Sequence, residues 1–264
     1  MNTGNNTEKK NTKINSVNRA LDIMELLCQE ERLMGVNEIA QMLGEYQSTI
    51  HRSISTLKER GYVYQDVDSA KYGLSYKVCM LGKSVSENSS LIQLAKPYAM
   101  KIAREFKETV NIAVREYSGG PGYHAVTIYQ ERGGKRTLSV TESIGKPYDC
   151  YYSGVGKALL AFSEDYSENV MRNIKLDRHT DNSIVDPELF IEEIARVREC
   201  GYAIDNEENE KGLYCIACPV RNSKGIAVLA ISVSGYKGQL HEIGVDNIIK
   251  SLQQASYEMS LQVL

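Results

Sequence analysis

The chain has 264 residues, of which 42% are hydrophobic and 25% are charged. This composition is typical of a soluble globular protein with one large domain or two ordinary ones. Thirty-one basic and 34 acidic residues give a net charge of −3, which excludes a strongly basic polymer-binding protein but leaves room for a local DNA-binding patch. The longest apolar run covers residues 226–231, far short of the ~20 residues that span a bilayer.

The first segment, residues 1–13, is rich in Asn, Thr and Lys and has no apolar stretch. We therefore expect a disordered arm and no secretory signal peptide. Six cysteines in a chain of this length, without such a signal, predict reduced thiols and a cytoplasmic protein.

Residues 14–61 show the periodicity of three short helices. The first is expected to be capped by Ser16, and its apolar positions at helical spacing are Val17, Ala20, Leu21, Met24, Leu27 and Cys28. The second should end at Gly44, and its apolar positions are Val36, Ile39, Ala40 and Leu43. The third is expected to begin at Ser48 as its cap and to end at Gly61, with Ile50, Ile54 and Leu57 as its buried stripe. A tight turn between the last two helices predicts a helix-turn-helix.

Two short β-like runs follow, at 62–64 and 71–74, with a polar turn between them. They predict a hairpin, the wing of a winged helix-turn-helix. Residues 75–90 have weak helical periodicity and a Ser/Asn-rich end, which favours a linker.

The second half of the chain alternates strands and helices. Strands are expected at 110–114, 123–129, 138–142, 215–220 and 225–233. Helices are expected at 91–106, 154–163, 165–173 and 187–200, and a final amphipathic helix includes 245–255. Hairpin connections predict mostly antiparallel strands with helices packed against them, an α+β domain. In the run 229–234, alternation places Leu229, Ile231 and Val233 on one face and Ala230, Ser232 and Ser234 on the other.

The third helix offers the strongest candidate for DNA contact. Net charge gives no indication, because residues 1–82 hold ten basic and ten acidic side chains. If the apolar stripe faces the core, however, polar side chains that can contact base edges or phosphates lie on the other side: Gln47, Ser48, Thr49, His51, Arg52 and Ser55. Lys58, Arg60, Lys71 and Lys77 are expected to add phosphate contacts. The alternative is a helical packing module with a solvated polar face.

Several segments resemble, in order, the IclR family of bacterial transcription regulators. In the first half these are residues 15–23, 48–52 and 57–64. In the second half they are residues 153–161, 201–205, 212–220 and 230–235. The resemblance covers about residues 14–262, and although each motif is loose, the ordered set is specific.

The resemblance implies a winged helix-turn-helix at 14–76, a linker helix at 77–90 and a GAF-like effector-binding domain with a mostly antiparallel sheet at 91–264. It implies effector contacts at Gly154, Val155, Asp205, Cys215, Ser232 and Ser234, and more weakly at Val140, Tyr148 and Cys150. Independently of the family, the small hydroxyl-bearing face of 230–234 suits a small polar ligand, and N–H groups at 153–154 could hold a carboxylate. Three alternatives stay open. Asp205 is solvated, Cys215 makes ordinary packing contacts in its strand, or the side chains of the neighbouring tyrosines pack in the core: Tyr148, Tyr151 and Tyr152.

Signals for an enzyme are weak. Residues 154–158 resemble a phosphate loop, but the required Gly and hydroxyl are replaced by Tyr151 and Ala158. Cys215 and Cys218 have CxxC spacing, yet strand positions three apart face opposite sides, and no second pair lies at chelating distance. We expect no metal and no cofactor, and the four histidines have no triad spacing.

The sequence therefore favours a ligand-responsive, DNA-binding transcription regulator, by family default a repressor of a catabolic operon controlled by a small organic acid or sugar acid. A homodimer or a dimer of dimers would contact a pseudo-palindromic operator, with no role for a membrane. Two alternatives remain: a small-molecule enzyme whose N-terminal helices form an oligomerisation module, and an interaction adaptor.

Overall fold

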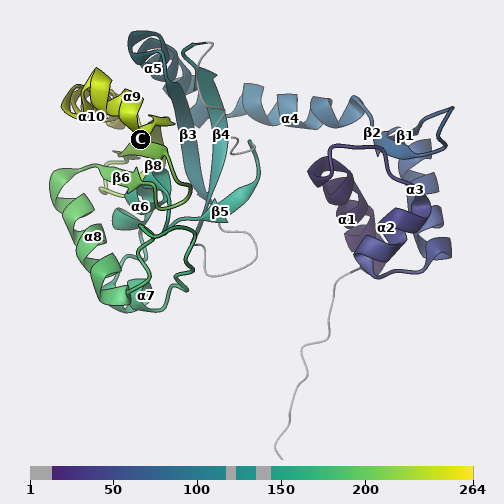
Figure 1. Ribbon diagram of the computed structural model, residues 1–264. Helices are drawn as coiled ribbons and strands as arrows, with labels where there is room; N and C mark the ends of the chain where they lie inside the picture. The colour runs from purple at the N-terminus through teal and green to yellow at the C-terminus, as the bar shows by residue number, and fades with distance from the viewer. Residues whose placement is uncertain (1–13, 117–122, 135–143, 264) are drawn as a thin grey trace, which may run out of the picture. The chain divides into compact units, whose positions relative to one another are not determined.

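The computed structural model describes residues 14–116, 123–134 and 144–263. The chain divides into two compact units, Met1–Val85 and Ser86–Leu264 (Figure 1). The expected arm at 1–13 and the expected strand at 138–142, which contains Val140, lie outside the described residues. No helix in the described ranges combines the length and apolar character needed to cross a bilayer.

The first unit contains three helices and a hairpin, as the sequence predicts. They are α1 (Asn15–Gln29), α2 (Val36–Leu43), α3 (Gln47–Glu59), β1 (Val63–Gln65) and β2 (Tyr72–Leu74). The helices surround a core that includes Ile39, Ile50 and Ile54, each fully buried. A bridge between Met34 and Tyr72 joins the α1–α2 connection to the hairpin. Gly44 ends α2 in the left-handed conformation, at φ 65°, which Gly adopts without steric cost.

The predicted start of α1 was wrong, and its predicted buried face was right only in part, since Leu27 is buried and Ala20 and Met24 pack against the core. Ile14, not Ser16, is the N-cap, and Val17, Leu21 and Cys28 are exposed. The buried face consists of Ile23, Leu26 and Leu27. Apolar residues occupy two sides of α1, so periodicity alone does not determine which side faces the core.

The cap of α3 also differs from the prediction. Tyr46 is the N-cap, and its carbonyl accepts hydrogen bonds from the N–H groups of Thr49 and Ile50. Ser48 therefore lies in the first turn of the helix. The stripe Ile50, Ile54 and Leu57 is buried as predicted.

A helix with no buried residue, α4 (Lys77–Asn88), follows the hairpin and includes the boundary between the units. The second unit is built on an antiparallel sheet, whose six described strands have the order β5-β4-β3-β8-β7-β6. The strands are β3 (Thr109–Glu116), β4 (His124–Arg132), β5 (Pro147–Asp149), β6 (Ala203–Asn206), β7 (Leu213–Arg221) and β8 (Ala227–Tyr236). The α+β class and the antiparallel sheet are thus confirmed.

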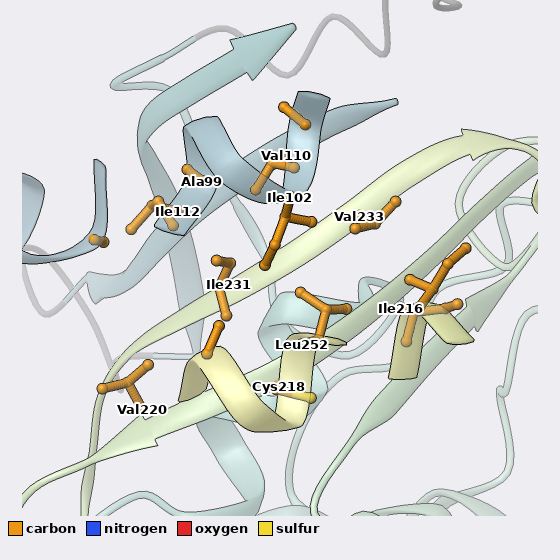
Figure 2. Close-up of a cluster of buried hydrophobic side chains, with 14 of the residues drawn as sticks. Ala99, Ile102, Val110, Ile112, Ile216, Cys218, Val220, Ile231, Val233 and Leu252 are labelled. Atoms are coloured by element: carbon orange, nitrogen blue, oxygen red, sulfur yellow. The ribbon is translucent and has the colours of Figure 1, made fainter. Parts of the chain in front are cut away.

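Helices cover both faces of the sheet. On one face, α5 (Ser90–Phe106) and α10 (Val245–Ser260) pack against strand residues that include Val110, Ile231 and Val233 (Figure 2). On the other face are α6 (Gly154–Ala161), α7 (Glu168–Arg172) and α8 (Pro187–Cys200). The short α9 (Lys237–Ile243) precedes α10. The expected helix at 165–173 is shorter in the structure, because Ser167 caps it at the Val170 N–H.

Candidate functional site

The exposed side of α3 is the candidate nucleic-acid interface. Gln47, Ser48, His51, Arg52, Ser55 and Lys58 are exposed, and Thr49 is half-buried. The Ser55 hydroxyl donates to the carbonyl of His51 at 2.8 Å. A groove of about 930 Å³ lies between α1 and α3, and its lining includes Arg19, Leu21, His51 and Arg52.

In the described part of the chain, Arg52 has no ion pair, unlike Arg19, Arg32 and Lys71 of the same unit. Arg19 lies 3.1 Å from Glu45, Arg32 lies 3.0 Å from Glu38, and Lys71 lies 3.4 Å from Glu38. Among the residues that the structure describes, no carboxylate lies within ion-pair distance of Arg52. A segment with balanced charge therefore leaves a guanidinium available on the exposed face of α3.

Two of the other predicted phosphate-contacting residues, Lys58 and Lys77, have hydrogen-bond partners within the unit. The Lys58 ammonium donates to Gln65 Oε1 at 2.8 Å, which links α3 to β1. The Lys77 ammonium donates to the carbonyl of Arg60 at 2.7 Å and lies over the ring of Tyr62. Both bonds are exposed; the first holds β1 beside α3, and the second holds the start of α4 beside the end of α3.

In the second unit, strand register brings the predicted effector residues together. Asp205 on β6 pairs with Cys215 on β7, and Cys215 pairs with Ser234 on β8. Ala217 pairs with Ser232 in the next row of this face. Asp205, Ser232 and Ser234 are at most 2% exposed, so the solvated alternative for Asp205 was wrong.

The start of α6 lies directly on this part of the sheet. A Cβ on Gly154 would lie 3.4 Å from the carbonyl oxygen of Cys215 and 3.5 Å from the amide nitrogen of Asp205. Ser153 caps the helix by accepting a hydrogen bond from the Gly156 N–H at 3.1 Å. The N–H groups at the helix N-terminus, where anions bind favourably, are therefore next to the row of Asp205, Cys215 and Ser234.

Two weaker predictions lie further away. Tyr148 is on the edge strand β5, three strands from β8, and its hydroxyl is 3.2 Å from Thr127 Oγ1. Cys150 is fully buried and packs beneath α6, because a Cβ on Gly156 would lie 2.3 Å from Cys150 Cα. The structure does not bring Tyr148 into the row around Ser234.

The sequence analysis missed two polar networks next to this row. Asn111 donates to the Ser234 hydroxyl at 3.0 Å and accepts a hydrogen bond from Gln130 at 2.9 Å. Lys157 is fully buried, and its ammonium lies 2.5 Å from Glu208 and 3.2 Å from Glu193. The sequence signal for the second network was Lys157 itself, a lone lysine within the apolar run 154–161. A buried charge requires a partner.

The same contacts exclude two other interpretations. The Lys157 ammonium is held by carboxylates, so residues 154–158 do not act as a phosphate loop. Cys218 packs in the core under α5 and α10, whereas Cys215 belongs to the row with Asp205. Within the described ranges, no group of three or more His, Cys, Asp or Glu could hold a metal ion.

Two family descriptions match consecutive parts of the chain. Residues 16–67 match the IclR helix-turn-helix domain, and residues 83–261 match the C-terminal domain of the bacterial transcriptional regulator IclR. The chain is 30% identical to the HTH-type transcriptional regulator KdgR of Escherichia coli over 97% of its length and 95% of that protein. It is 29% identical to the DNA-binding transcriptional repressor YiaJ of E. coli, over 93% of this chain and 86% of that protein.

A solved structure shares the fold. An IclR homologue from Microbacterium hydrocarbonoxydans, complexed with 4-hydroxybenzoate, aligns with a TM-score of 0.77 and 18% identity over 93% of this chain and 98% of its own. The matched relatives are named transcriptional regulators, so the enzyme alternative is not favoured. The chain therefore belongs to the IclR family of transcription regulators, with a DNA-binding helix-turn-helix domain followed by an effector-binding domain.

Proposed function

We propose that this regulator is a repressor of a catabolic operon whose affinity for its operator is set by a small organic acid or sugar acid. The observation that supports the DNA part is the geometry of α3, which buries Ile50, Ile54 and Leu57 and leaves Arg52 exposed without an ion-pair partner in the described chain. Arg52 would contact a base edge, and the remaining members of the interface are Gln47, Ser48, Thr49, His51, Ser55, Lys58 and Lys71.

The proposed effector site is the row at the start of α6. Its members are Gly154, Val155, Asp205, Cys215, Ser232 and Ser234, with Cys150 and Tyr148 as outer members; Val140, outside the described residues, stays a sequence prediction. Hydroxyl groups and helix N–H groups suit a carboxylate. The relative complexed with 4-hydroxybenzoate supports an acid as the ligand class.

The proposed assembly is a homodimer or a dimer of dimers. Residues 77–90 act as the linker, and α4 within it has no buried residue. Leu81 and Val85, one helical turn apart, are 55% and 69% exposed, as expected of a surface that a second copy covers. The effector would then act by shifting the population of dimer geometries that fit two half-sites.

DNA binding is tested on sites selected by the full chain from a random duplex library. Arg52→Ala is expected to weaken binding to the selected site by about 1–3 kcal/mol, as for loss of a base contact, measured by fluorescence anisotropy. Arg172→Ala, on the surface of the other unit, is the control and should leave binding unchanged. Unchanged binding in the Arg52 variant would remove it from the interface, and selected sites without two-fold symmetry would contradict the dimer.

Effector binding is tested by thermal shift with acetate, pyruvate, gluconate and 4-hydroxybenzoate. A ligand present at a hundred times its Kd adds about 2.7 kcal/mol of stability. The Ser232→Val/Ser234→Val variant should lose this shift, whereas Ser223→Val, in the exposed turn between β7 and β8, should keep it. An undiminished shift in the double variant would place the site elsewhere.

A further inference from the structure

We propose that Asp205 takes part in the effector site as a neutral carboxylic acid, which donates its proton in a hydrogen bond to a carboxylate oxygen of the effector. The inference rests on the proposed function, because it concerns the same site. It adds a protonation state to the effector contact that the family resemblance implies at Asp205.

The first support is the position of Asp205. The residue is 1% exposed, and its Oδ1 accepts the Glu208 N–H at 2.8 Å. Its register partner is Cys215, which pairs in turn with Ser234. The first residue of α6 packs against its backbone. An anion held by the N–H groups of α6 and the Ser234 hydroxyl would therefore lie beside the Asp205 carboxyl group.

The second support is the charge balance of the cluster behind Asp205. The Lys157 ammonium lies 2.5 Å from Glu208 and 3.2 Å from Glu193. The Arg196 guanidinium makes two hydrogen bonds to Glu193, of 2.7 and 2.9 Å. Two cations and two carboxylates balance, so an ionised Asp205 would add an uncompensated buried charge, which costs several kcal/mol.

The charge of Lys157 on α6 lowers the pKa of Asp205, but Glu208 and Glu193 already share this cation. The other groups that face Asp205 offer no counter-charge. On β7 and β8 these are the thiol of Cys215 and the hydroxyl of Ser234. Glu208, from the turn after β6, is itself acidic, and its Oε2 is buried without a hydrogen-bond partner among the described residues. His179, on the loop that packs over Glu208, lies 3.1 Å from the Tyr151 hydroxyl. Across the described chain, no Lys, Arg or His lies within 4 Å of an Asp205 oxygen.

These surroundings favour the protonated form. Burial and the charge of Glu208 raise the pKa of Asp205 to about 7. Above this pH, Asp205 is ionised and would repel a carboxylate effector unless Asp205 takes up a proton from solvent. Binding then adds one proton to the Asp205 carboxylate and breaks no covalent bond. An anionic effector would bind best below pH 7.

The test uses isothermal titration calorimetry on the full chain with the panel acid that stabilises it most at pH 6. At each pH, titrations in two buffers that titrate there and differ in ionisation enthalpy (Mes and bis-Tris at pH 5.5, Tricine and Tris at pH 8.5) count the protons exchanged. The expected uptake is close to zero at pH 5.5 and approaches one proton at pH 8.5. Since only the protonated fraction binds, Kd should rise about tenfold per pH unit above pH 7.

Asp205→Asn provides the sharpest comparison, because its amide is neutral and can donate at every pH. This variant should bind at pH 6 within about fivefold of the parent and should show neither proton uptake nor a pH slope. Glu207→Gln is the control: Lys237 and the Gly212 N–H lower the pKa of this carboxyl, so the parent profile should persist. A pH-independent Kd in the parent, or an unchanged slope in Asp205→Asn, would overturn the inference.

A measurement on the free protein separates this inference from the proposed function. The Asp205 carboxyl carbon, assigned by its disappearance in Asp205→Asn, should titrate near pH 7 in ¹³C NMR spectra. Titration below pH 5 would overturn the inference whatever the ligand is. If the carbon titrates near pH 7 but no panel acid binds at pH 6, the carboxylate effector of the proposed function is wrong instead.

Discussion

Lys157 shows how one side chain controls the packing of α6 against β6 and α8. Its ammonium is fully buried between Glu208 and Glu193. Burying such a pair adds little net stability, but removing one partner leaves an uncompensated charge. The lysine therefore determines whether two neighbouring carboxylates can remain inside the protein.

Lys157→Met is expected to destabilise the second unit by about 3–5 kcal/mol, because Glu208 and Glu193 lose their shared cation. Urea unfolding measures the loss. Lys175→Met is the matched control: this lysine is 84% exposed beside Asp177, and surface pairs contribute about 0–1 kcal/mol. Adding Glu208→Met to Lys157→Met should recover part of the loss. A single variant within 1 kcal/mol of the parent would contradict the argument.

At the level of single residues, the sequence could identify the type of side chain at the site but not its burial or its ion-pair partners. Small residues and hydroxyls at 230–234 predicted a polar face, and the register confirms that Ser232 and Ser234 share it. The neutralisation of the buried Lys157 depends on Glu193 and Glu208. These residues are far from Lys157 in sequence, so no local pattern links them.

Among the elements, α6 and α4 each contain a glycine, Gly156 and Gly82, and the space around these two residues differs. Gly156 in α6 faces Cys150, whose Cα and carbonyl oxygen would both lie 2.3 Å from an added Cβ. Gly82 in α4 has no atom within 4 Å of such a Cβ. Because Gly weakens a helix relative to Ala, the same substitution should have opposite effects in the two helices.

Gly82→Ala should stabilise α4 by about 0.5–1 kcal/mol. Gly156→Ala should cost at least about 1–3 kcal/mol, because backbone atoms must move to admit the methyl group. Circular dichroism melts of the two variants give the comparison. A melting temperature of Gly156→Ala equal to that of the parent would contradict the close packing of α6 on Cys150.

Elements with one clear apolar stripe were predictable, and short or ambiguous ones were not. α2 and α3 each have a single stripe, so their buried faces follow from spacing, although the start of α3 does not. α1 has apolar residues on two sides, and only the packing of Ile23 and Leu26 against the core decides between them. β5 has three residues, too few to show a period in the sequence. Its extended form depends on pairing with β4.

For the molecule as a whole, buried carboxyl groups determine the response to pH. Burial raises the pKa of Glu108 to about 7, and burial together with Glu208 raises that of Asp205 to about 7. The folded state thus retains protons that the unfolded chain releases near its ordinary pKa of about 4. The free energy of unfolding should therefore fall as pH rises from about 5 to 7.

Thermal melts between pH 5 and 8 measure this slope. Asp205→Asn and Glu108→Gln should each flatten it, because neither amide titrates. Glu207→Gln should leave the slope in place, since the pKa of that carboxyl is lowered and it titrates below this window. A stability that increases from pH 5 to 7 would contradict the assignment of protons to Asp205 and Glu108.

The helix α4 has a consequence for how the two halves of the chain are tethered. None of its twelve residues is buried, and Gly82 lies within it. Isolated helices shorter than about 12–15 residues are marginal in water, so the coil and helical forms of this tether differ little in free energy. Its amide hydrogens should exchange with deuterium sooner than those of α6 or α10. A small free-energy contribution, from contact with DNA or with a neighbouring copy, would therefore be enough to shift this tether between its helical and coil forms.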